Sequence, residues 1–292
     1  MFSSRLALSL PNKVATGIKN FKYNKRVMKK CAYFLILIIA FALFSCNGAV
    51  VTSADKNKDE FVTKKLQTVC LLDSTEENSP KCKTDISIDV VMSADKEREA
   101  KINNSILYAI FGYENISVET AIDSFVAYVN EEYACLRPEY INEKQINANA
   151  AWLNHSYIIN TQVEYGRKGV INYIIHSELY TGGANPNSVC TIINFDSETG
   201  CEIKLDDIFK ENYEEYLCSR LTDALAKKIG ADSREEIKEK GYLTFNDIYP
   251  TENFIMKEDS ILFYYNLYEI APRAAGTTIL GFKYDELSTI MK

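Results

Sequence analysis

Residues 156–179 read SYIINTQVEYGRKGVINYIIHSEL. The runs at either end are rich in β-branched and aromatic residues, which is typical of strands. Between them lies Gly166-Arg167-Lys168-Gly169, a glycine-bounded turn that is short enough to join neighbouring strands. The stretch therefore predicts an antiparallel hairpin with strands at 156–165 and 170–179.

Further elements are predicted on both sides of this hairpin. Residues 84–90 alternate polar and apolar side chains, which indicates a half-buried strand. We predict that a helix capped by Ser93 follows and runs to about Ile110, and that a second helix opens at Ser117. After the hairpin we predict strands at 189–195 and 201–205. A helix follows that carries Leu217, Leu221, Leu225 and Ile229 and stops at Gly230, with a charged helical extension over 231–241. The last predicted elements are strands at 260–267 and 277–283 and a short C-terminal helix.

Strands and helices come in separate runs rather than in regular alternation. This arrangement favours an α+β fold with antiparallel sheets and packed helices over a doubly wound parallel sheet. We divide the folded part into two contiguous sub-domains, an N-terminal one at 66–188 and a C-terminal one at 189–292.

The N-terminal region has the layout of a bacterial lipoprotein signal. Two lysines follow Met28, an apolar run follows them, and a small residue precedes Cys46. The apolar run is shorter than the ~20 residues that a spanning helix needs, and this order of segments marks a removable signal. We predict a signal peptide at 28–45, lipidation of Cys46 and a flexible tether over 46–65. Residues 1–27 are interpreted as a mistaken translation start or, alternatively, as an N-terminal extension of the signal.

Removal of the signal changes the charge of the chain. Of 33 basic and 40 acidic residues, eight basic and no acidic ones lie in residues 1–45, so the remainder carries 25 against 40, a formal charge of −15. Nucleic-acid binding requires a basic footprint, which the sequence lacks. A cationic protein or peptide would be attracted to such a surface. The alternative is that the acidic surface serves solubility only.

Six cysteines remain besides the lipidated Cys46 after the expected processing, and none has the spacing of a zinc ligand set. An even number in an exported protein permits disulfides. Cys70 and Cys82 bracket a polar loop and form the best local pair. Cys190 and Cys201 fall in different registers of their predicted hairpin, so we expect no bond between them. We expect no metal ion and no cofactor.

Catalytic motifs are scarce. The two histidines, His155 and His176, lie in predicted strands, and alternation places His176 and Glu178 on one face with Ser177 on the other. There is no G-x-S-x-G elbow, HExxH, P-loop or GxGxxG motif. Common hydrolase and nucleotide chemistry is therefore disfavoured, and a site made of carboxylates alone stays open.

Two segments stand out as candidates for a binding site. The first, residues 180–187, leaves a strand through paired glycines, which permit positive φ and close backbone approach. The second, residues 262–276, places Glu269 among apolar and aromatic residues, where a carboxylate needs hydrogen bonds or a cation. We hypothesise that Glu269 accepts backbone N–H bonds from the loop at Thr181–Ala184, so that both segments form one rim. The predicted rim residues are Tyr180, Thr181, Gly182, Gly183, Asn185, Asn187, Tyr268, Glu269, Pro272 and Arg273.

The same segments carry a family resemblance. The family pattern is Y-T-G-G-A-H-P-N, then N-x-D-x-x-T-G, L-x-x-L-F and F-Y-x-x-Y-E-I-A-P-Y-A-x-G. It appears here at 180–187, 194–200, 205–209 and 263–276. Over about residues 66–290 the chain resembles the exported C-terminal domain of RsiV-type proteins, the lysozyme-sensing anti-sigma factors, which also occurs in some peptidoglycan deacetylases and many uncharacterised lipoproteins.

The resemblance implies an α+β envelope module that binds rather than catalyses. Two rim positions depart from the family pattern, because Asn185 replaces a histidine and Arg273 replaces a tyrosine or similar residue. Since we expect export of the whole chain from Cys46 onward, we do not expect an anti-sigma role.

These observations lead to one leading expectation of function. We expect a lipid-anchored envelope protein on the periplasm-facing side of a membrane, with a module that binds a protein or cell-wall ligand such as a lysozyme-like muramidase. The alternatives are a glycan-modifying enzyme that uses carboxylates such as Glu269 or Glu178, and a structural subunit of an envelope complex.

Overall fold

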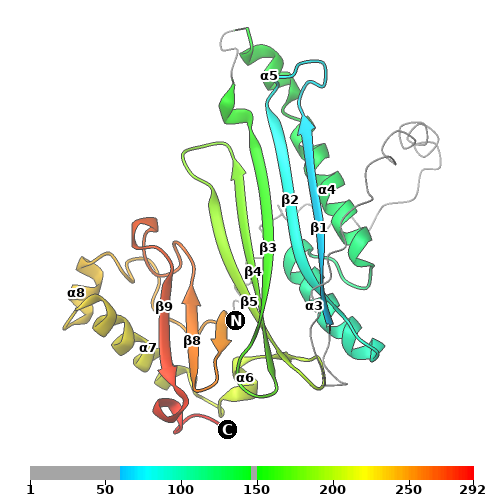
Figure 1. Cartoon of the computed structure of the whole chain (residues 1–292). Helices are drawn as coiled ribbons and strands as arrows, with labels where there is room; N and C mark the ends of the chain where they lie inside the picture. The colour runs from blue at the N-terminus through cyan, green and yellow to red at the C-terminus, as the bar shows by residue number, and fades with distance from the viewer. Residues whose placement is uncertain (1–59, 146–149) are drawn as a thin grey trace. The chain divides into compact units, whose positions relative to one another are not determined.

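The computed structural model describes residues 60–145 and 150–292, which form two β-sheets with helices packed against them (Figure 1). The predicted signal peptide, Cys46 and most of the predicted tether lie outside these residues. Across the two described ranges, no helix is long and apolar enough to cross a membrane.

The larger sheet contains six strands in sequence order. Its members are β1 (Glu60–Leu71), β2 (Lys81–Met92), β3 (His155–Tyr165), β4 (Val170–Thr181), β5 (Asn187–Asp196) and β6 (Glu202–Ile203). All neighbours are antiparallel except β2 and β3, which are parallel. A parallel pair needs a long crossover, and here it contains α3 (Lys96–Phe111), α4 (Val118–Ala134), α5 (Arg137–Glu143) and the 3-10 helix η2 (Ala151–Leu153). The α+β class is confirmed, and the predicted hairpin at 156–179 corresponds to β3 and β4.

Strand β1 was not among the elements predicted from the sequence. Residues 60–65, which we assigned to the tether, pair with β2 from Met92 to Ser87. The Phe61 ring lies 6.4 Å from the ring of Tyr173 in the core. The charged pair Lys64-Lys65 interrupts the alternation of apolar residues in the sequence. The strand is therefore recognised from its hydrogen-bonded pairing with β2.

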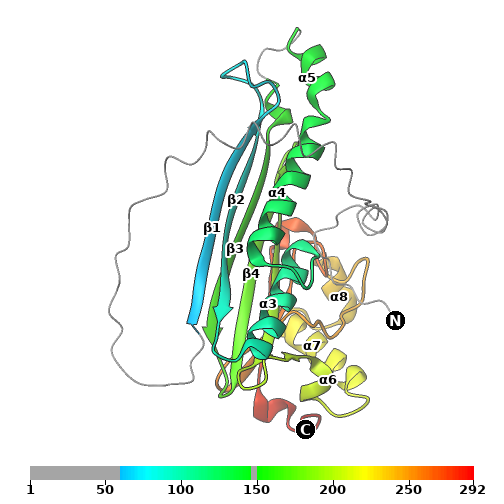
Figure 2. The same cartoon turned by 90° about the vertical axis from the view of Figure 1, so that its right-hand side faces the viewer.

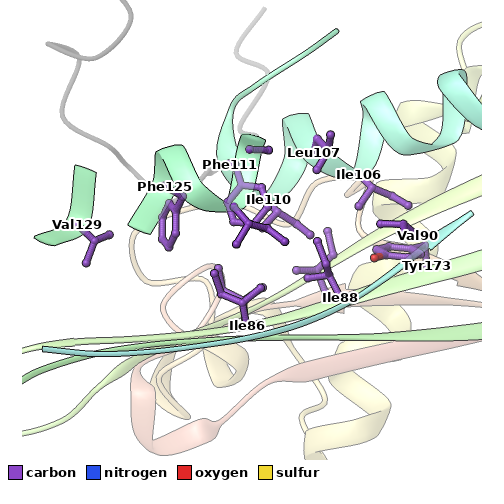
Figure 3. Packing of buried hydrophobic residues seen from close by; sticks show 14 of the residues in the cluster. Ile86, Ile88, Val90, Ile106, Leu107, Ile110, Phe111, Phe125, Val129 and Tyr173 are labelled. Carbon is purple, nitrogen blue, oxygen red and sulfur yellow. The ribbon is translucent and has the colours of Figure 1, made fainter. Parts of the chain in front are cut away.

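Helices α3 and α4 cover one face of the six-stranded sheet (Figure 2). Figure 3 shows Ile86 and Ile88 of β2 on the sheet side of this core, beneath Ile110 of α3 and Phe125 and Val129 of α4. Val90 of β2 and Tyr173 of β4 lie together beneath Ile106 of α3. Ser117 caps α4 as predicted, because its hydroxyl accepts from the Thr120 N–H at 3.1 Å. The cap of α3 is Asp95 rather than Ser93, since the Asp95 carboxylate accepts from the N–H groups of Glu97 and Arg98.

A three-stranded antiparallel sheet forms the second part of the structure. It consists of β7 (Phe254–Met256), β8 (Ser260–Tyr265) and β9 (Thr278–Lys283), and its associated helices are α6 (Leu205–Ile208), α7 (Glu214–Ile229), α8 (Arg234–Glu239), η3 (Arg273–Ala275) and η4 (Tyr284–Leu287). Leu217, Leu221 and Leu225 of α7 are buried in the same cluster as Phe254 and Phe263 of the sheet. Gly230 ends α7 in the left-handed conformation, and Ser233 caps α8, so the predicted helical extension over 231–241 is a separate short helix.

The second predicted hairpin is present as β5 and the short β6. Phe195 pairs with Glu202 of β6, and Cys190 lies opposite His176 on β4. The register of the hairpin is set by the turn at Asp196, whose carboxylate accepts from the N–H groups of Glu198 and Thr199 at 3.1 and 2.7 Å. Residue 205, predicted as strand, starts α6.

Buried asparagines join the two sheets within one compact unit. The Asn172 amide donates to the Met256 carbonyl at 3.1 Å and accepts from the Met256 N–H at 3.0 Å. Asn194 donates to the Phe254 carbonyl at 2.9 Å. The boundary that we placed between residues 188 and 189 falls inside β5, which pairs with β4 over its whole length.

Candidate functional site

The loop between β4 and β5 requires glycine at its first position. Gly182 and Gly183 have φ of 85° and 105°, in the left-handed region that favours glycine. A Cβ atom at residue 182 would lie 2.6 Å from the Trp152 carbonyl oxygen, whereas at residue 183 it would meet nothing within 4 Å. The Tyr180 hydroxyl donates to the Gly183 carbonyl at 3.0 Å. Close packing on η2 therefore fixes the path of this loop.

The second predicted segment begins with a tight turn after β8. The Asn266 N–H donates to the Glu269 carboxylate at 3.0 Å, and the Glu269 N–H donates to the Asn266 carbonyl at 3.2 Å. Burial raises the pKa of the Glu269 carboxyl above its usual range, and hydrogen bonds from Asn266 and Tyr249 oppose that rise. The hypothesis that Glu269 binds N–H groups of the Thr181–Ala184 loop is therefore wrong, because its carboxylate closes its own turn.

This turn positions the Asn266 side chain on the edge of β5. The Asn266 amide accepts from the Cys190 N–H at 2.7 Å and donates to the Cys190 carbonyl at 2.9 Å. Asn253 acts in the same way, since its amide accepts from the Ile192 N–H at 2.7 Å and donates to the Cys190 carbonyl at 2.9 Å. An open strand edge exposes backbone groups that favour unwanted pairing. Two asparagine side chains here occupy those groups in place of another strand.

A single arginine connects the two predicted segments. Arg273 Nη1 donates to the Pro186 carbonyl at 2.8 Å. Pro272 lies beside Gly241, where an added Cβ would be 3.7 Å from the Pro272 Cγ atom. We call the loop 181–187 together with the segment 266–276 the rim. The idea of one shared rim therefore stands on Arg273, one of the two positions that depart from the family pattern.

Aromatic side chains of the rim and of the segments next to it are exposed to solvent. Tyr268 has φ of 67°, uncommon for a residue with a bulky side chain, and 62% of it is exposed. Phe245, on the neighbouring loop, is 96% exposed. That loop is fixed to the rim because Asn246 donates to the Glu269 carbonyl at 3.3 Å and the Leu243 N–H donates to the Ile270 carbonyl at 2.8 Å. Trp152, whose carbonyl meets Gly182, is 40% exposed.

Sequence reasoning missed Phe245 and Trp152. Nothing in either local pattern shows that the ring faces solvent, since an isolated aromatic residue in a polar loop is more often buried. The remaining predicted rim residues are placed less tightly. Thr181, Asn185 and Asn187 are exposed, and Asn187 pairs with Leu179 at the start of β5.

The match to a known sequence family covers one of the two rim segments. The sequence profile of the family described as "Protein of unknown function (DUF3298)" matches residues 206–285. Residues 206–285 are thus similar to the DUF3298 family along the length of that match. The RsiV-type resemblance is confirmed at this level, since the RsiV-type domain is a DUF3298-related family. The matched stretch contains the rim segment 266–276, whereas the loop 181–187 precedes it.

Solved structures extend the likeness beyond the matched stretch. A crystal structure of a DUF3298 family member from Bacteroides fragilis NCTC 9343 is similar with a TM-score of 0.75 and 27% identity, over 82% of this chain and 96% of that one. A DUF3298 family protein from Pseudomonas aeruginosa PAO1 shares the fold, with a TM-score of 0.52 and 19% identity over 80% and 95% of the two chains. No curated protein matches the chain.

The other candidate residues lie apart from the contacts that define the rim. Cys70 and Cys82 are direct partners in the β1–β2 pair, and Cys82 lies next to His155 on β3. Burial raises the pKa of the Cys82 thiol to about 12. Glu178 lies opposite Ser188 on β5. Among the residues that the structure describes, no group of three or more His, Cys, Asp or Glu side chains is arranged to hold a metal ion.

Proposed function

We propose that the chain is a lipid-anchored cell-envelope protein whose rim, together with the neighbouring loop 243–247, binds a protein ligand. The observation that carries the proposal is the pair of solvent-facing aromatic rings, Tyr268 and Phe245, on a backbone fixed by hydrogen bonds. Aromatic residues dominate the energetics of protein interfaces, and rigid presentation reduces the entropy lost on binding. A backbone held in an uncommon conformation at Tyr268 is the kind of strain that occurs at ligand-binding sites.

Charge supports a cationic ligand. The formal charge of −15 from Cys46 onward would accelerate the approach of a basic protein. Lysozyme-like muramidases are basic proteins and are the ligands that the RsiV resemblance implies. A c-type lysozyme is therefore the first ligand to test, and a peptidoglycan fragment is the second.

Lipid attachment at Cys46 supplies the location in this proposal. Several acyl chains on one N-terminus anchor a protein stably, whereas a single chain is marginal. We propose the periplasm-facing leaflet, because the residues after Cys46 begin Asn47-Gly48-Ala49 without an acidic cluster. Acyl-peptide mass spectrometry of the N-terminus tests this part: an acylated Cys46 supports it, and an unmodified chain that starts upstream contradicts it.

The alternative functions rest on weaker observations. A carboxylate enzyme would use Glu269 or Glu178, and the Glu269 carboxylate already accepts the Asn266 N–H within its own turn. A structural subunit would need an assembly interface, for which the rim itself is the best candidate. Incubation with peptidoglycan followed by mass analysis of the fragments tests the enzyme.

The binding test uses the full chain in detergent and immobilised c-type lysozyme. Tyr268→Asn removes the ring, and asparagine tolerates the left-handed conformation better than most residues. We expect Tyr268→Asn and Phe245→Ser each to weaken binding by about tenfold or more, as for aromatic residues at interface centres. Tyr216→Ala, at a partly exposed tyrosine on α7, is the matched control and should bind as the wild type does. Equal binding by all four proteins, or no binding by any, contradicts the proposal.

A further inference from the structure

A groove runs between helix α7 and the outer edge of β9. Its volume is about 550 Å³, and its walls are the side chains of α7 from Arg220 to Lys228 and the strand residues Ile279–Phe282. Strand β9 is an edge strand, because the order of the small sheet is β7-β8-β9 (Figure 1). The groove lies on β9, whereas the rim segment ends before that strand begins.

The backbone of β9 presents hydrogen-bonding groups to this groove. In an antiparallel pair, alternate residues direct both backbone groups toward the partner strand and the residues between them direct both outward. The Tyr284 N–H donates to the Asp259 carbonyl of the β8 side, and the Tyr264 N–H donates to the Asn253 carbonyl of the β7 side. With the observed register, Leu280 and Phe282 therefore pair with β8, while Ile279 and Gly281 point outward. Ile279 and Gly281, whose backbone groups point outward, line the groove together with Leu280 and Phe282.

The helical wall of the groove is basic. It carries Arg220, Lys227 and Lys228 against Asp223, and Glu286 of η4 adds a second carboxylate to the lining, in a chain that is strongly acidic from Cys46 onward. The Arg220–Glu286 contact is long, at 3.9 Å, and Arg220 Nε is buried without a hydrogen-bond partner among the described residues. Both lysines are exposed. This wall favours a ligand that brings negative charge.

We propose that the β9 edge is a docking site for an extended, acidic segment of a partner protein, which adds to the small sheet as a fourth strand. Strand addition gives affinity through main-chain hydrogen bonds and specificity through alternate side chains. Successive side chains of a strand point to opposite faces of a sheet, and α7 covers only one face. The partner segment therefore carries acidic residues at every second position, which face Arg220, Lys227 and Lys228. This inference does not depend on ligand binding at the rim.

The test uses the isotope-labelled full chain in detergent and the peptide acetyl-Glu-Thr-Glu-Thr-Glu-Thr-amide. Expected results are chemical-shift changes at the Ile279 and Gly281 amides and affinity about tenfold lower in 1 M salt, since exposed ion pairs are screened. Two control peptides separate the contributions. The first control is methylated on the backbone nitrogens, either of the three Thr residues or of the three Glu residues. Only one of these two sets carries the N–H groups that pair with β9, so we expect one of the two methylated peptides not to bind. The second control replaces Glu by Lys, which reverses the charge, and we expect it not to bind.

Protein variants test the same contacts from the other side. Ile279→Pro removes an outward N–H without removing a bond to β8, and proline is tolerated on edge strands in this way. Lys227→Glu with Lys228→Glu should reduce affinity for the acidic peptide, whereas Lys238→Glu on α8 makes a charge change of the same sign away from the groove and should not. Unchanged Ile279 and Gly281 amides at millimolar peptide, or equal binding of both methylated peptides, overturns the proposal. So does a concentration-dependent dimer that protects these two amides without peptide, because the edge would then belong to a second copy of the chain. The peptide controls keep the test decisive if Ile279→Pro does not fold.

Discussion

Replacement of Asn266 by alanine tests how the rim segment is held on the large sheet. The variant loses the acceptor of the Cys190 N–H and one of two donors to the Cys190 carbonyl. A buried donor without a partner costs about 1–3 kcal/mol, and the second lost bond costs about 1 kcal/mol. The Cys190 carbonyl keeps Asn253 at 2.9 Å, so the second cost stays at the lower end. We expect a total loss of about 3 kcal/mol.

Thermal unfolding followed by circular dichroism measures this loss. For a folded part of this size, about 3 kcal/mol corresponds to a fall in Tm of about 6–12 °C. Asn246→Ala is the control, because it removes one exposed hydrogen bond of 3.3 Å and should lower Tm by about 2 °C or less. Equal, small effects of the two substitutions would refute the argument that asparagine side chains complete the edge of β5.

Three further predictions follow from other contacts. Gly182→Ala should destabilise the chain more than Gly183→Ala, by about 1 kcal/mol or more in urea unfolding, since both residues have positive φ but only residue 182 faces the Trp152 carbonyl; equal effects would contradict the packing argument. Cys70 and Cys82 should form a disulfide when the chain is incubated with oxidised glutathione, which accepts the two electrons. The free energy of unfolding should rise by about 3 kcal/mol, as for a disulfide that closes a loop of the length between these two cysteines. Non-reducing peptide mass mapping checks the bond, and alkylation of both thiols after oxidation argues against it. For Glu269, burial raises the folded-state pKa, so its contribution to stability is present below the unfolded pKa and is lost as pH rises through the folded value. The stability of the wild type relative to Glu269→Gln should therefore fall as pH rises above the unfolded pKa of a glutamate, and a rise with pH would reverse the assigned sign.

Elements that depend on local chemistry were predictable from the sequence. Ser117 caps α4 because its hydroxyl reaches an N–H three residues away, and Gly230 ends α7 because glycine adopts positive φ at little cost. The β3–β4 hairpin is similar, since its turn lies between two strand-forming runs. In each case the deciding interaction spans few residues.

Elements that depend on distant contacts were not predictable in the same way. The parallel pairing of β2 with β3 requires a crossover of three helices, and no residue in either strand signals it. The strands on both sides of residues 196–200 were predicted, but their register depends on the Asp196 carboxylate, which accepts from two N–H groups within the turn. Strand β1 is stabilised by its partner rather than by its own pattern.

The candidate site shows the same division. The sequence indicated that residues 180–187 and 262–276 belong together, and the Arg273–Pro186 hydrogen bond joins them. It assigned the contact to Glu269, because a carboxylate among apolar residues needs donors. The donors come from Asn266, three residues away, and the exposure of Phe245 depends on the fold of a loop with no regular pattern.

Hydrogen–deuterium exchange with c-type lysozyme shows whether the rim and the loop 243–247 are the ligand site. The full chain in detergent is measured with and without the ligand, and we expect slower exchange at residues 243–247 and 266–269, with weaker protection at 181–187 through Arg273. Measurable binding with protection elsewhere, or no binding at all, would contradict the assignment of the rim as the ligand site.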